Sequence, residues 1–299
     1  MNILLAGGTG FIGSELRTRL LQQGHMLTVI TRSPNKYENE TAANQQFISW
    51  DSHLPAHMEQ ADVVINLAGE SIFGQRWTED IKRRIYSSRI DSTHTLVEAI
   101  EKAGGHRPGL LISASAVGYY GDRGNTLLDE NEPPGDDFLS KVCIDWEKKA
   151  LEAKKMGVRV AIPRLGIVLG TEGGALQQML PPFKLFAGGP VGSGKQFFPW
   201  IHMHDLCRGL LYPIEREMFD GVYNLCSPDS VTMREFADTL GEVLGRPSFF
   251  RVPEFALNLV LGEAAGPIVN SLNVQPEKLQ QSGFEFEFEN LHEALSEIL

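Results

Sequence analysis

Met1-Asn-Ile-Leu-Leu-Ala-Gly-Gly-Thr-Gly-Phe-Ile-Gly13 is the stretch that decides the fold of this chain. Residues 2–6 form a short apolar run, which is typical of a strand buried on both faces of a parallel sheet. Glycines follow at once, and Phe11, Leu16 and Leu20 then recur at helical spacing. The stretch therefore predicts a strand, a tight glycine turn and a helix.

A turn of this kind is suited to binding phosphate groups. Glycines let the backbone turn sharply and approach a pyrophosphate closely, and the following helix offers unpaired N–H groups at its N-terminus. The spacing here is Gly-x-x-Gly-x-x-Gly, rather than the more common Gly-x-Gly-x-x-Gly. We expect the turn to bind a dinucleotide through Gly7, Thr9, Gly10, Phe11, Ile12 and Gly13.

The composition is that of an ordinary globular protein, with 299 residues of which 42% are hydrophobic and 22% charged. The net charge of −11 argues against a nucleic acid or an anionic membrane as partner. Three cysteines without paired spacing fit a reducing compartment better than a disulfide framework or a zinc knuckle. With no apolar run long enough to span a bilayer and no room for a signal peptide, we expect a cytoplasmic protein. A homodimer is left open as its oligomeric state.

Strands and helices alternate over the first half of the chain. Further buried strands are predicted at residues 25–31, 46–50, 61–69, 109–115, 158–170 and 221–226, with helices at 77–104 and 137–156. We therefore expect an α/β protein with a Rossmann-type doubly wound parallel sheet in residues 1–165. Residues 166–299 are expected to form a smaller α+β substrate lobe with a helical tail, and the return of part of residues 166–230 to the sheet is left open.

The end of the second predicted strand indicates which dinucleotide binds. In this fold an acidic residue there binds the ribose 2′-hydroxyl of NAD, whereas an arginine accommodates the 2′-phosphate of NADP. Here the residue is Arg32, with Thr31 and Ser33 beside it and no carboxylate near in the sequence. A solvated loop arginine is the alternative interpretation. We predict NADP as the cofactor.

Several further motifs resemble those of the extended short-chain dehydrogenase/reductase (SDR) superfamily. Asn66-Leu-Ala-Gly69 resembles its Asn-Ala-Ala-Gly element, Ser113 to Gly121 its Ser-Ser-x-x-x-Tyr-Gly block, and Arg164 to Gly170 its Arg-x-x-x-Val-x-Gly element. The whole chain resembles one atypical, epimerase-like branch with a C-terminal domain of unknown function, often labelled sugar-nucleotide-epimerase-like or cell-division-inhibitor-like. The resemblance implies a Rossmann domain, NADP binding and a C-terminal substrate lobe.

The resemblance also implies further cofactor contacts. The backbone of the Asn66 element passes the cofactor in this superfamily, and Arg89 stands where its helix is brought past the cofactor. Two alternatives remain open, namely that Asn66 caps the following turn and that Arg89 belongs to a solvated helix face. The implied cofactor-binding residues are Thr31, Arg32, Asn66, Leu67, Ala68, Gly69, Arg89, Ser113 and Arg164.

The catalytic tyrosine of the superfamily is missing. Its Tyr-x-x-x-Lys motif places a lysine one helical turn after the tyrosine, and Lys141 is suitably placed, but the matching tyrosine position is Asp137. Asp137 is either a general base or a helix N-cap. Tyr119 and Tyr120 either supply the phenol or pack beside the cofactor. The serine that holds the substrate oxygen is Ser113 or Ser115, and we prefer Ser115.

The substrate is expected between the two regions of the chain. The glycine-rich segment 188–195 is interpreted as a flexible loop over the site, and residues 197–205 resemble a Trp-Ile-His-Val-Asp-Asp stretch of the superfamily. We assign Trp77, Gly189, Trp200 and His202 to the substrate side. The His202-x-His204 pair is not assigned a metal, because two histidines on a strand need a third donor.

Two functions follow from these patterns. The first is an NADP(H)-dependent oxidoreductase or epimerase that acts on a small polar substrate, nucleotide-linked substrates included. The alternative is a catalytically weak NADP(H)-binding sensor or regulatory protein.

Overall fold

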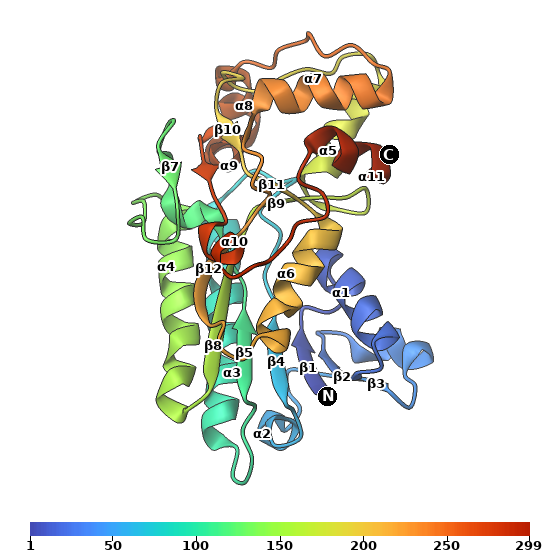
Figure 1. Ribbon diagram of the computed structural model, residues 1–299, viewed down its shortest axis with the longest axis vertical. Helices are drawn as coiled ribbons and strands as arrows, with labels where there is room; N and C mark the ends of the chain where they lie inside the picture. Colours follow the sequence, from blue (N-terminus) through green and yellow to red (C-terminus); the bar gives the residue numbers. More distant parts are fainter.

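A parallel sheet with helices on both faces forms the larger part of the computed structural model, which describes residues 1–299 (Figure 1). The strand order is β12-β8-β5-β4-β1-β2-β3, and β6 pairs with β8 beside this path. All of these pairs are parallel. The predicted Rossmann-type α/β fold is therefore confirmed. The strands are β1 (Asn2–Ala6), β2 (Met26–Ile30), β3 (Gln45–Ile48), β4 (Val63–Asn66), β5 (Leu110–Ser113), β6 (Ser115–Ala116), β8 (Arg159–Leu165) and β12 (Gly221–Leu225).

Side chains of the central strand β1 alternate between two cores. Ile3 and Leu5 pack under α1 and α6, whereas Leu4 and Ala6 pack under α2, α3 and α4. A strand covered on both faces has no polar side, which is why residues 2–6 form a continuous apolar run. The covering helices are α1 (Phe11–Gln22), α2 (Leu54–Met58), α3 (Glu79–Lys102), α4 (Phe138–Leu151) and α6 (Met203–Glu215).

A smaller part lies at one end of the sheet (Figure 1). Its core joins α5, α7 and α11 around Phe183, Trp200 and Phe236. Its short strands pair two by two, β9 with β11, β10 with β13 and β14 with β7. Its elements are β7 (Leu127–Leu128), β9 (Ile167–Leu169), α5 (Gly174–Lys184), β10 (Phe197–Phe198), β11 (Trp200–His202), β13 (Val231–Thr232), α7 (Met233–Leu244), α8 (Glu254–Leu261), α9 (Gly266–Val269), β14 (Asn273–Val274) and α11 (Leu291–Ile298). Helix α10 (Glu277–Gln281) belongs to the larger part, since its Leu279 lies in the core under the main sheet.

The predicted strand at residues 158–170 is in fact two strands in different sheets. A side chain at Gly166 would lie 2.7 Å from the carbonyl oxygen of Pro199, so the chain bends there against the β10–β11 segment. Residues 167–169 then pair with β11 instead of the main sheet. Two later elements, α6 and β12, return to the main sheet and its covering layer. The division of the chain at residue 165 into two domains stays a prediction. None of the helices has both the length and the apolar character that a bilayer crossing requires.

Close backbone packing fixes the turn between β1 and α1. Gly7 has a φ of +82°, and a Cβ there would lie 2.6 Å from the carbonyl group of Leu67 in the turn after β4. A Cβ on Gly13 would lie 2.1 Å from the carbonyl oxygen of Gly7. Glycine is therefore required at both positions, because no side chain fits between these backbone segments.

Replacing Gly13 by alanine should lower the free energy of unfolding by about 1–3 kcal/mol, the usual cost of an overpacked site. The clash involves backbone atoms, which cannot move aside like a flexible side chain. Urea denaturation measures the change. Gly105→Ala is the matched control, since a Cβ there meets nothing within 4 Å. Equal stability of both variants would contradict the close packing of the turn.

Candidate functional site

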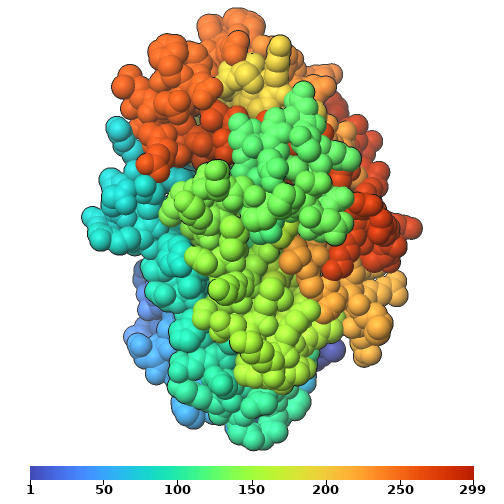
Figure 2. Space-filling view, turned by 90° about the vertical axis from the view of Figure 1, so that its left-hand side faces the viewer, coloured from blue at the N-terminus to red at the C-terminus, as the bar shows by residue number.

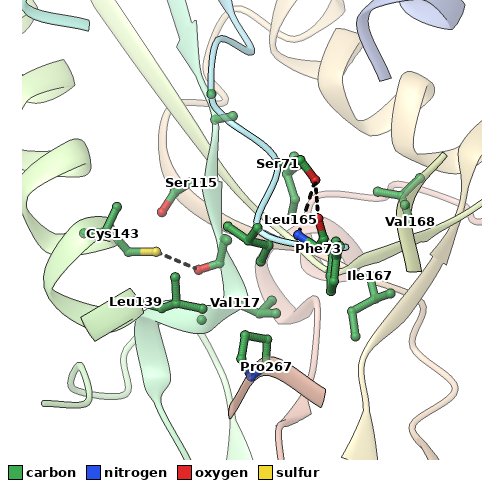
Figure 3. A pocket seen from close by; sticks show the side chains of 18 of the residues that line it. Ser71, Phe73, Ser115, Val117, Leu139, Cys143, Leu165, Ile167, Val168 and Pro267 are labelled. Carbon is green, nitrogen blue, oxygen red and sulfur yellow. Dashed lines mark hydrogen bonds between the residues drawn. The ribbon is translucent and has the colours of Figure 1, made fainter. Parts of the chain in front are cut away.

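A cavity of about 430 Å³ lies where β1, β4 and β5 end, at the border between the two parts of the molecule. One half is formed by the glycine turn, the start of α1 and the segment after β4. The other half is formed by side chains from four separate stretches of chain. Figure 3 shows Val117, Leu139 and Pro267 close to one another on one side of it.

The first half contains many of the residues predicted to bind the cofactor. Those that line the cavity are Gly7, Gly10, Phe11, Ile12, Gly13, Leu67, Gly69 and Arg89. The N-cap of α1 is Gly10, which gives no side-chain cap, and the first turn carries no acidic residue. The N–H groups of this helix end are thus free of side-chain partners, and the end is suited to an anion.

Arg32 lies next to this turn. Since Ala6 pairs with Ile30, the segments that follow β1 and β2 leave the sheet side by side. The Arg32 side chain is 87% exposed, and its guanidinium is 4.0 Å from the Glu70 carboxylate. The sequence interpretation assumed no carboxylate near Arg32, and the fold corrects this, because Glu70 follows β4 and is distant in sequence. Thr31 is buried, and its hydroxyl accepts a hydrogen bond from the Ser33 N–H at 3.4 Å.

Asn66 and Ser113 lie behind the cavity wall rather than on it. The Asn66 amide donates to the Thr93 hydroxyl at 2.8 Å and to the Ser113 hydroxyl at 3.4 Å. Its oxygen accepts from the Ala68 N–H at 3.2 Å, so the turn-capping alternative describes one of its contacts. These side chains hold β4, β5 and α3 together and position the wall formed by Leu67 and Gly69.

Arg89 is a cation with no carboxylate in ion-pair contact. It donates to the Ile85 carbonyl at 3.0 Å, and its guanidinium lies 5.3 Å from the centre of the Trp146 ring and directly beside Gly69. Burial lowers the pKa of this guanidinium, although an arginine stays charged in proteins. Arg89 therefore supplies positive charge to the cavity wall, and the solvated-face alternative does not describe it.

Ser115 is the preferred serine, and it lines the cavity (Figure 3). Its hydroxyl donates to Glu147 Oε1 at 2.7 Å. Arg164 binds the same carboxylate with two nitrogens, at 2.8 and 2.9 Å, and both residues are buried. Burial acts to lower the pKa of Arg164, but the hydrogen bonds and charge of Glu147 outweigh it and raise the pKa. Arg164 is therefore a structural partner of Glu147 and, contrary to expectation, does not line the cavity.

Neither predicted tyrosine lines the cavity. Tyr120 is fully buried, donates to Asn224 Oδ1 at 2.7 Å and accepts from Arg164 at 3.0 Å. Burial raises the pKa of its phenol to about 12. The ring of Tyr119 is half-buried and lies 3.4 Å from the Arg164 guanidinium. Both rings pack around Arg164, away from the cavity, which differs from both alternatives: neither ring supplies a phenol to the cavity or packs beside the glycine turn.

Helix α4 presents a different set of residues to the cavity from the one predicted. Lys141 is exposed to solvent. Asp137 is the N-cap, whose carboxylate accepts from the Ser140 N–H at 2.8 Å, although it also reaches the edge of the cavity. The residues within α4 that line the cavity are Leu139, Val142, Cys143 and Trp146, which share one face of the helix. Burial raises the Cys143 pKa to about 12, so this position holds a neutral thiol.

None of the four residues assigned to the substrate lines the cavity. Trp77 packs on Phe138 and donates to the Ile72 carbonyl at 3.1 Å. Trp200 is in the core of the smaller part and donates to the Asp229 carbonyl at 3.1 Å. His202 is paired with Glu297 at 2.9 Å. Gly189 packs against the backbone of Phe250. Each side chain or backbone is engaged in packing elsewhere, so the structure does not bring these four residues to the cavity.

Sequence reasoning missed the residues that close the cavity from the C-terminal side. Pro267, Asn270 and Leu272 line it, and the Asn270 amide donates to the Asp137 carboxylate at 3.4 Å. They lie in a region of short helices with no motif, so no sequence signal pointed to them. The cavity is also lined by Glu70, Ser71, Ile72 and Phe73. These residues directly follow the Asn66 element, and that position in the sequence could have identified them.

The parallel sheet, the glycine turn and the cavity beside it define a nucleotide-binding protein of the epimerase type. The chain belongs to the NAD dependent epimerase/dehydratase family, whose family model matches residues 3–226. A second family model, Domain of unknown function (DUF1731), matches residues 252–298. The predicted membership of an atypical extended SDR branch is confirmed.

Relatives are similar over the whole chain. "Epimerase family protein SDR39U1 homolog, chloroplastic" from Arabidopsis thaliana is 41% identical over 100% of this chain and 87% of its own length. "Epimerase family protein YfhF" from Bacillus subtilis is 39% identical over 100% of this chain and 98% of its own.

Solved structures agree with this assignment. Human epimerase family protein SDR39U1, crystallised with NADPH, has a TM-score of 0.90 and 36% identity, covering 100% of this chain and 99% of that one. UDP-glucuronic acid 4-epimerase from Bacillus cereus, crystallised with UDP-glucuronic acid and NAD, has a TM-score of 0.79, covering 100% of this chain and 98% of that one. At 19% identity, the second likeness supports the fold alone.

Replacing Glu147 by alanine should lower the free energy of unfolding by about 3–5 kcal/mol, because it leaves the buried Arg164 without its counter-charge. Chemical denaturation measures the change. Glu98→Ala is the matched control, since Glu98 forms an exposed helix pair with Lys102 that is worth well under 1 kcal/mol. Similar losses in both variants would show that the Arg164 pair is not the structural centre inferred here.

Proposed function

We propose that this protein binds NADP(H) in the half of the cavity formed by the glycine turn. The observation that carries the proposal is the uncapped N-terminus of α1 beside Gly7, Gly10 and Gly13, where the backbone leaves no room for side chains. That arrangement fits a pyrophosphate. The NADPH bound to the human relative supports the same cofactor class.

Arg32 is the proposed partner of the cofactor's 2′-phosphate. Its guanidinium is exposed and has one carboxylate contact, with Glu70 at 4.0 Å. That distance is long for an ion pair, so a phosphate can compete for the guanidinium. Arg89 is proposed to lie along the cofactor where it crosses Gly69. When bound, the nicotinamide supplies or accepts a hydride.

The proposed substrate is a small carbonyl compound or alcohol that is largely apolar. The half of the cavity away from the glycine turn is mainly apolar, with Val117, Leu139, Leu165, Ile167, Pro267 and Leu272 among its lining residues. A sugar nucleotide would leave its hydroxyls without partners on such walls. This proposal replaces the small polar substrate expected from the resemblance.

Ser115 is proposed to hold the substrate oxygen. Its O–H is committed to Glu147, which leaves its oxygen lone pairs to accept a hydrogen from a substrate hydroxyl. The Arg164 pair fixes the carboxylate and therefore the direction of the serine hydroxyl. We also keep the cytoplasm as the proposed compartment, because Cys143, Cys207 and Cys226 are all free thiols.

A specific observation favours the sensor as a second candidate. No tyrosine and no lysine lines the cavity, so the couple that transfers the proton in this superfamily has no counterpart at the predicted place. A protein with this wall is suited to holding the cofactor and poorly equipped for rapid proton transfer. The sensor function would use the same cofactor site.

Wild-type protein should bind NADP(H) in preference to NAD(H), and Arg32→Ala should weaken NADPH binding about 10- to 100-fold. The loss corresponds to one charge-assisted arginine–phosphate contact of about 1.5–3 kcal/mol. Fluorescence titration with NADPH and NADH measures it. NADH affinity should be unchanged in the variant. Equal affinities of the wild type for NADPH and NADH would contradict the assignment of NADP as the cofactor.

NADPH oxidation should be slow with every substrate, and faster with small apolar aldehydes and ketones than with UDP-sugars. Ser115→Ala should lower the rate of NADP⁺-dependent oxidation of the corresponding alcohol by roughly 10²–10³, the usual effect of removing a hydrogen bond to the reacting oxygen, because the alcohol carries the hydroxyl from which Ser115 can accept. Lys141→Ala is the control and should keep the wild-type rate, because Lys141 faces solvent.

The outcomes separate the two candidates. A rate that falls in Lys141→Ala but not in Ser115→Ala would support the interpretation from the sequence, in which Lys141 is the lysine of the catalytic motif. Tight NADPH binding with no turnover on either substrate panel would favour the sensor, and hydrogen exchange should then show protection of residues 254–272 by NADPH but not by NADP⁺.

A further inference from the structure

The exposed apolar side chains of this protein are concentrated at one end. Eight of the fifteen large hydrophobic residues that are exposed fall in two segments, residues 184–195 and 246–261. We call these eight the end patch. They are Leu185, Phe186, Phe249, Phe250, Val252, Phe255, Leu259 and Val260. A concentration of this kind on a protein surface marks a place of interaction.

The two segments lie side by side. The Phe250 N–H donates to the Gly188 carbonyl at 3.1 Å, and the Val252 N–H donates to the Pro190 carbonyl at 3.1 Å. The Arg246 guanidinium lies 4.4 Å from the ring centre of Phe186. The patch is therefore a joint surface of both segments and not two unrelated exposures.

Helix α8 continues this surface. It is almost wholly apolar, with Glu254 as its one charged residue, and none of its residues is buried. Phe255 and Leu259, one helical turn apart, are 74% and 75% exposed. A helix that is apolar around most of its circumference normally has a covering partner, and here the outer face has none within the chain.

The two segments that carry the end patch have a net charge opposite in sign to that of the whole molecule. The two segments contain four basic residues, Lys184, Lys195, Arg246 and Arg251, all exposed, and a single acidic one. Their net charge is +3, so the remainder of the chain carries −14 within the total of −11. The total charge, which argued against an anionic membrane, conceals a basic and apolar end.

We propose that the end patch docks on an anionic lipid surface, with Phe255 and Leu259 entering the headgroup region. Apolar side chains surrounded by arginine and lysine are the usual features of a protein that lies on such a surface without crossing it. The orange atoms of residues near 250 project from the upper end of the molecule in Figure 2, and a projecting surface suits a flat partner. A second copy is disfavoured, because a twofold contact would bring the basic residues of both copies together.

Vesicle flotation tests this proposal with the full-length protein. Wild type should float with vesicles of phosphatidylcholine and phosphatidylglycerol but not with phosphatidylcholine alone, and added salt should weaken the binding. Leu259→Asp should lower the binding constant roughly tenfold or more, as expected when one buried leucine is lost. Met218→Asp is the matched control, because Met218 is 95% exposed and lies outside the patch.

A second variant tests whether a loss of binding in Leu259→Asp comes from misfolding of α8. Lys184→Glu with Lys195→Glu leaves the apolar residues in place and should abolish binding to the anionic vesicles, while thermal denaturation stays close to wild type, because both side chains are exposed. No flotation of wild type with phosphatidylglycerol, or an equal loss in Met218→Asp, would overturn the proposal. So would a wild-type dimer in sedimentation that Leu259→Asp converts to a monomer, since the occupant would then be a second copy.

Discussion

The buried ion pair between Arg164 and Glu147 connects most elements around the cavity. Arg164 lies near the end of β8 and Glu147 belongs to α4, so the pair fixes a helix to the sheet. Ser115 is bound to the carboxylate, and Tyr119 and Tyr120 pack on the guanidinium. A buried pair is costly to desolvate and tolerates little change in geometry. Its value here lies in orientation: it determines where the Ser115 hydroxyl points and leaves the tyrosines no freedom to reach the cavity.

Sequence patterns predicted the fold well because the fold depends on local features. The apolar run at residues 2–6 indicated a doubly covered strand, and Gly7 and Gly13 stand where the backbone excludes any side chain. The helix predicted at residues 77–104 is α3, and Thr78 caps it by accepting from the Ile81 N–H. Such signals are contained within one strand, one turn or one helix.

The site could be predicted only in part. It depends on which side of a helix each side chain faces, and on contacts between residues that are distant in the sequence. The motif comparison pointed to α4 and to positions 137 and 141, whereas Asp137, Leu139, Val142, Cys143 and Trp146 line the cavity. Two residues turn a helical side chain by more than half a circle, which is why Lys141 faces solvent and Cys143 faces the cavity. The Glu70 contact with Arg32 joins residues from two separate strand ends. Neither fact is visible before the elements are assembled.

The late position of Pro267, Asn270 and Leu272 in the chain has a consequence for biosynthesis. The glycine turn leaves the ribosome well before the wall opposite it. Strand β12, which covers the edge of β8, also comes more than fifty residues after its neighbour. In a nascent chain the edge of β8 is thus open until β12 is made, and the cavity is unfinished until residues 267–272 follow. Exposed edges of this kind invite pairing with other chains, so the interval between the synthesis of β8 and that of β12 is when this edge is open to such pairing.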